Sequence, residues 1–103
     1  MKTSNSPRRD NVSFRFLGGA YKEDSLLSGT VVVRDGAMVL DIPGSKDGPY
    51  LIVGSAHKNW YEGKNSAAGL RHKVDAKWAE VGGAYVGIWV ESNEEFLFSF
   101  NLE

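Results

Sequence analysis

The chain has 103 residues, no cysteine and a net charge of −1 at pH 7, with 42% hydrophobic and 24% charged residues. This length and composition predict one globular domain and exclude a wholly disordered chain. The near-neutral charge argues against a general nucleic-acid-binding protein, because contacts to phosphates need an excess of Lys and Arg.

Residues 1–11 are polar and predict a flexible tail ahead of a single domain over residues 12–103. They lack the apolar stretch of a secretory signal, and no later run approaches the roughly 18 apolar residues of a transmembrane helix. Without cysteine the chain has no disulfide and no thiolate metal site, which fits a reducing compartment. We therefore expect a cytoplasmic protein that has no membrane partner.

Residues 12–17 predict the first strand of the domain. Val12, Phe14 and Phe16 occupy alternate positions and should share the face that points into the core. Residues 18–28 predict either a wide loop or a short strand, because apolar and polar residues follow no clear period there.

The Asp-Gly pair at 35–36 predicts a tight hairpin between residues 30–34 and 37–42. Asp-Gly between alternating apolar residues is a strong signal for a two-residue type I′ turn. Residues 43–49 contain two prolines and two glycines and predict a loop, and residues 50–55 predict the next strand.

Residues 57–62 add an eighth strand if they are extended, and otherwise the sheet has seven. Residues 65–70 are small and polar, and predict a loop or a single helical turn. No helix longer than about two turns is expected anywhere in the chain.

The strongest pattern lies in the last third of the chain, where three apolar-alternating stretches are separated by turn residues. Their predicted core-facing sets are Val74, Ala76 and Trp78, then Val86, Ile88 and Val90, then Phe96, Phe98, Phe100 and Leu102. These sets share one face only if both connecting loops have three residues, 82–84 and 92–94. The resulting registers place Ile88 opposite Trp78 on one side and opposite Phe98 on the other.

Consecutive strands with short loops predict an all-β fold, an antiparallel meander of seven or eight strands that closes into a small barrel. A two-sheet sandwich is the alternative. The absence of a long crossover connection favours the barrel. We expect its interior to be filled by the rings of Phe14, Phe16, Trp78, Phe96, Phe98 and Phe100.

No motif in the sequence predicts catalysis, and we expect neither a metal nor a cofactor. His57 and His72 are fifteen positions apart, which matches no spacing of a zinc or iron site. A small enzyme that uses one of these histidines with Glu62, Asp75 or Glu80 as an acid–base pair is a hypothesis that depends on the fold bringing them together.

The stretch from His57 to Asn65 sets two large aromatic rings among amides and charges. Rings bury area while polar groups orient a partner, so this stretch suits recognition. We therefore predict a non-enzymatic module that binds a small ligand or a protein partner. Its predicted binding residues are His57, Asn59, Trp60, Tyr61, Glu62 and, at the rim, His72.

Tyr85, Trp89 and Leu97 lie on the face opposite the predicted core, with Trp89 directly opposite Leu97 in the registers above. An apolar patch of this kind either marks an interface or is covered by a second sheet or a long loop. The alternative function is therefore a self-associating protein, a homodimer, that pairs through Tyr85, Trp89 and Leu97.

Overall fold

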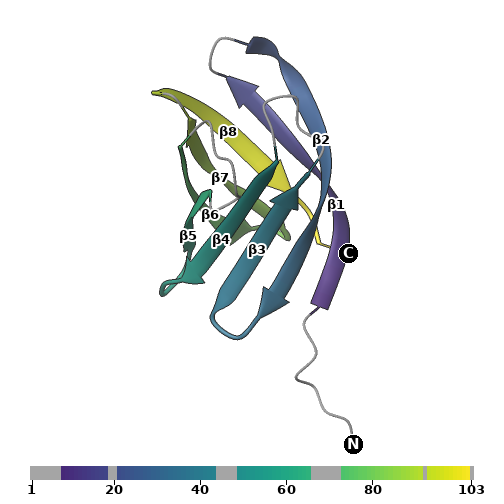
Figure 1. Cartoon of the computed structure of the whole chain (residues 1–103), viewed down its shortest axis with the longest axis vertical. Coiled ribbons are helices and arrows are strands. Elements are labelled where there is room, and N and C mark those ends of the chain that lie inside the picture. The colour runs from purple at the N-terminus through teal and green to yellow at the C-terminus, as the bar shows by residue number, and fades with distance from the viewer. Residues whose placement is uncertain (1–7, 19–20, 44–48, 66–72, 92, 103) are drawn as a thin grey trace, which may run out of the picture.

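A computed structural model describes residues 8–18, 21–43, 49–65, 73–91 and 93–102, apart from the side chains of residues 8, 9 and 21–25 (Figure 1). Eight strands form a closed barrel in which each strand lies beside its neighbours in sequence and the last pairs with the first. The strands are β1 (Arg8–Gly18), β2 (Tyr21–Arg34), β3 (Ala37–Ile42), β4 (Tyr50–Ala56), β5 (Tyr61–Asn65), β6 (Val74–Val81), β7 (Ala84–Glu91) and β8 (Glu94–Phe100). The predicted all-β antiparallel barrel is confirmed.

β1 and β2 are longer than the sequence pattern indicates, and run side by side along one side of the barrel (Figure 1). β1 begins at Arg8 rather than Val12, because its pairing with β2 extends to Arg8 opposite Val33. β2 begins at Tyr21, so a strand and not a wide loop follows β1. The described residues contain no helix, and hence none long and apolar enough to cross a membrane.

The hairpin of β2 and β3 forms as predicted. Val31 pairs with Leu40, the register that a two-residue turn at 35–36 requires. The eighth strand also exists as β5, but it begins at Tyr61 because the preceding four residues, 57–60, make the turn from β4. The predicted loops over 43–49 and 65–70 fall almost entirely outside the described residues.

Aromatic rings fill the barrel interior. Phe14 lies against Phe100 with ring centroids 5.1 Å apart, and Phe98 lies 6.0 Å from Trp78 and 5.6 Å from Trp89. The indole N–H of Trp78 donates to the sulfur of a buried methionine, Met38, at 3.2 Å. Among the described residues the interior is therefore a packed core, as the sequence predicts.

The predicted register of β6 and β7 is wrong. The turn contains two residues, Gly82 and Gly83, and it pairs Trp78 with Gly87 instead of Ile88. Both glycines have positive φ, 62° and 90°, the combination of a type I′ turn, whose twist matches that of an antiparallel pair. Apolar alternation predicts that the aliphatic residues of β7 face the core, but Val86 and Ile88 face outward, so the predicted register is wrong by one residue.

The predicted register of β7 and β8 is wrong for the same reason. Glu91 pairs with Glu94, so the connection has two residues rather than three, and Trp89 pairs with Phe96. Asn93 in this turn has a φ of 66°, a conformation that Asn tolerates better than most residues. The face of β7 that points into the barrel is therefore the one that carries Trp89.

Trp89 is 2% exposed, and its predicted position on the outer face is wrong. Its ring meets Phe16 edge to face at a centroid distance of 4.9 Å and Tyr50 at 5.3 Å. One oxygen of Glu91 accepts a hydrogen bond from the Trp89 indole at 3.0 Å, and the other accepts one from the Tyr50 hydroxyl at 2.5 Å. Tyr85 also turns inward and stacks on a core phenylalanine, so of the predicted interface only Leu97 lies fully outside.

Candidate binding site

The turn between β4 and β5 divides the two predicted aromatic residues between the two faces of the barrel wall. Tyr61 points inward and stacks on Trp78, with centroids 5.7 Å apart. Trp60 has the opposite strand parity and lies on the outer face. The backbone N–H of His57 donates to the carbonyl of Trp60 at 2.7 Å, which holds the two ends of the turn together.

Four outward side chains gather around the Trp60 ring and form what we call the Trp60 cluster: His57, Trp60, Glu62 and Lys77. The imidazole stacks on the indole at 4.2 Å with an interplanar angle of 13°. Nε2 of His57 lies 3.4 Å from Oε1 of Glu62, and the Lys77 ammonium lies 5.5 Å from the centre of the Trp60 ring. These contacts hold the indole in one orientation without burying it.

The structure brings together three of the six predicted binding residues: His57, Trp60 and Glu62. Tyr61 belongs to the core packing, and Asn59 is exposed at the tip of the turn. His72 lies outside the described residues. The sequence pattern did not indicate Lys77 as a site residue, because Lys77 is distant in sequence from Trp60. It comes close to Trp60 only through the pairing of β5 with β6, in which Lys77 lies opposite Glu62.

The His57 and Glu62 pair has the spacing of an acid–base pair but not its surroundings. Both side chains are more than two-fifths exposed on an open outer face, so nothing there excludes water from a reacting group. Asp75 pairs with Lys64 at 3.6 Å, and Glu80 is exposed near the far end of β6. No group of His, Asp and Glu among the described side chains could hold a metal ion.

A row of aliphatic side chains starts beside this cluster and crosses the outer face of the barrel. Lys77 is paired with Ile88, Ile88 with Leu97, and Leu97 with Leu17, so these positions form one continuous row across β6, β7, β8 and β1. Val86 lies one outward position along β7 from Ile88. We call Leu17, Val86, Ile88 and Leu97 the outer strip; their side chains are between 39% and 53% exposed.

A shallow depression joins the Trp60 cluster to the outer strip. Its lining comes from the turn before β5 and from β6 and β7, and consists of Trp60, Lys77, Trp78, Ala79, Val86, Gly87 and Ile88. The sequence contains the signal for this surface, namely the two-residue turn at Gly82 and Gly83. Once that turn is accepted, strand parity places Val86 and Ile88 outside.

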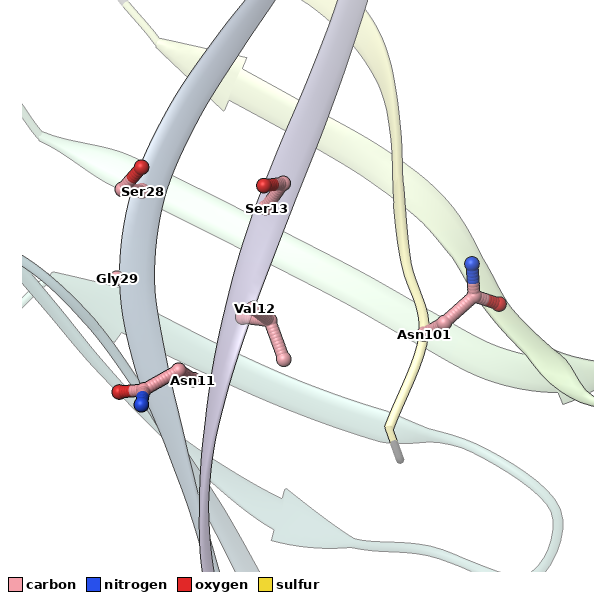
Figure 2. A pocket seen from close by; sticks show the side chains of 6 residues that line it. All are labelled: Asn11, Val12, Ser13, Ser28, Gly29 and Asn101. Atoms are coloured by element: carbon pink, nitrogen blue, oxygen red, sulfur yellow. The ribbon is translucent and has the colours of Figure 1, made fainter.

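A second candidate lies at the seam between β1 and β8. Their ladder ends where Arg15 pairs with Ser99, and two positions further on Ser13 and Asn101 lie on segments that diverge (Figure 2). A hollow of about 510 Å³ opens there. Its lining is uncharged and mostly polar, consisting of Asn11, Val12, Ser13, Ser28, Gly29 and Asn101. The seam is lined mainly by polar atoms, whereas the depression between the outer strip and the Trp60 cluster is lined mainly by apolar atoms.

Comparison of the chain with protein-family models and with curated proteins finds no match in either set.

Proposed function

We propose that this protein is a non-enzymatic protein-binding module whose site is the outer strip together with the Trp60 cluster. The observation that supports it is the continuous apolar row on the outer face of a barrel whose interior is already filled. Exposed apolar rows of this kind, bounded by polar groups, are typical of protein interfaces.

The chemistry of the site favours a protein over a small ligand. The strip is aliphatic, and the depression beside it is too open to bury most of a small molecule. The Trp60 ring is already stacked on His57 and approached by Lys77, so it acts as a positioned anchor at the edge of the strip. Tryptophan beside a charged rim is the composition expected of an interface hot spot.

Site-specific photo-crosslinking in the cells that produce the protein tests this proposal. A benzophenone amino acid at position 97 should give covalent adducts of defined mass. The matched control is position 53, because Val53 is 46% exposed on the outer face of β4, away from the strip, compared with 53% for Leu97. An Ile88→Glu change in the same chain should remove the adducts from position 97. Equal adducts from both positions, or none from position 97, would contradict the proposal.

A further inference from the structure

We infer that the partner of the outer strip is a second copy of this chain, which forms a two-fold symmetric and reversible dimer. This inference rests on the proposed function and names the partner of the same site. Three observations support it: the size of the surface, the match of the strip to itself, and the charges at its two ends.

The surface has the size of a weak protein interface. Five adjacent strands from β5 to β1 span about 19 Å at a strand spacing of about 4.8 Å, and outward positions follow each other every 6.7 Å or so. Three outward rows give roughly 400 Å² along the curved wall, an upper bound on the area that one copy can bury, which corresponds to a low-end interface rather than a permanent one. A dimer of this size should dissociate in roughly the tens to hundreds of micromolar.

The strip is complementary to itself under a two-fold rotation. Consider an axis that lies in the contact plane and passes over β7 between Ile88 and Val90. The strand registers place the outward positions of β7, β8 and β1 on a regular grid. The rotation that places Leu17 of one copy over Val86 of the other also places Leu97 over the region around Ile88. Apolar positions therefore meet apolar positions on both copies, as an isologous interface requires.

The same rotation brings opposite charges together. Glu95 follows Leu97 by one outward position towards the β7–β8 turn, and Lys77 pairs with Ile88 on the other side of the strip. Both side chains are exposed. The axis above sets Glu95 of one copy against Lys77 of the other, and it does so twice because the interface is symmetric. The same axis passes close to Arg15, which is exposed, so the two copies of this side chain also face each other, and the two Glu95–Lys77 contacts have to outweigh that repulsion.

Sedimentation equilibrium of the purified full chain, from about 10 µM to 1 mM, tests the inference. The wild-type chain should shift from monomer to dimer. Ile88→Glu should raise the dissociation constant at least about tenfold, whereas the matched control Val53→Glu should leave it unchanged. Ile88→Thr, which keeps a β-branched residue, should give a smaller weakening in a chain of normal stability.

Charge reversal tests the predicted contact between Lys77 and Glu95 directly. Lys77→Glu and Glu95→Lys should each weaken the dimer, and the two changes combined in one chain should restore it. A monomer throughout, a dimer indifferent to Ile88→Glu, or a double variant as weak as the single ones would overturn the inference. If the chain is monomeric while position 97 still gives crosslinks to a protein of another mass, self-association is wrong and the proposed function stands.

Discussion

Trp89→Ala should lower the free energy of unfolding by about 3 to 5 kcal/mol, the usual result of removing a large ring from a packed core. The indole is 2% exposed and meets the rings of Phe16, Tyr50 and Phe98, so little can move to fill the space. The change also removes one hydrogen-bond donor from Glu91. For a domain whose total stability is about 5 to 15 kcal/mol, this loss is a large fraction of the total.

The neighbouring position gives the matched control for this prediction. Ile88 is 40% exposed, so Ile88→Ala should cost less than about 1 kcal/mol in the dilute chain. Chemical denaturation of both variants, followed by circular dichroism, measures the difference. A larger loss at Ile88 than at Trp89 would mean that β7 presents its other face to the core.

Gly87→Ala should cost about 3 kcal/mol, although it adds only one methyl group. Gly87 faces the interior opposite Trp78, where β6 and β7 approach closely. A Cβ at this position would collide with the carbonyl oxygen of Lys77 and would lie 2.7 Å from Cα of Trp78. These are backbone and near-backbone atoms, so the two strands have to separate. Alanine gives the unfolded chain less conformational entropy than glycine does, and this effect offsets only part of the loss in stability.

Val86→Ala is the control for the glycine substitution, because Val86 is the outward neighbour of Gly87 on the same strand. Its side chain is 39% exposed, and the expected loss is below about 1 kcal/mol. Thermal unfolding of the two variants at low concentration separates them. A Gly87→Ala chain as stable as the wild type would contradict the close approach of β6 and β7.

In the first half of the barrel, the inward face of β1 and the hairpin of β2 and β3 could be predicted from the sequence because their signals agree with each other. In β1 the inward positions Val12, Phe14 and Phe16 alternate strictly, and all three are buried. The Asp-Gly turn sets the register of β2 and β3 independently of side-chain polarity. Where turn chemistry and apolar alternation indicate the same register, a single sequence is enough.

The second half could not be resolved in this way, because the two signals conflict. β7 is apolar on both faces: Tyr85 and Trp89 on one, Val86 and Ile88 on the other. A strand of this kind has no polar face to fix its register, so the turn decides it. The pair Gly82-Gly83 was the better guide, since it favours a two-residue turn on its own backbone preferences.

The candidate site was partly predictable for the same physical reason. His57, Trp60 and Glu62 are close in sequence and lie on one hairpin, so local spacing indicated that their side chains lie together. Lys77, Leu17 and the aliphatic residues of β7 reach the site only through the registers of other strands. Contacts between strands distant in sequence depend on the closed barrel, and a one-residue error in β7 was enough to move Trp89 to the wrong face.

The outer strip, the proposed function and the proposed dimer all depend on the register of β6, β7 and β8. Cross-strand nuclear Overhauser effects between backbone protons measure that register directly in solution. The structure predicts contacts that pair Trp89 with Phe96 and Trp78 with Gly87. Contacts that instead pair Val90 with Phe96 and Trp78 with Ile88 would put the aliphatic residues of β7 in the core and would contradict the account.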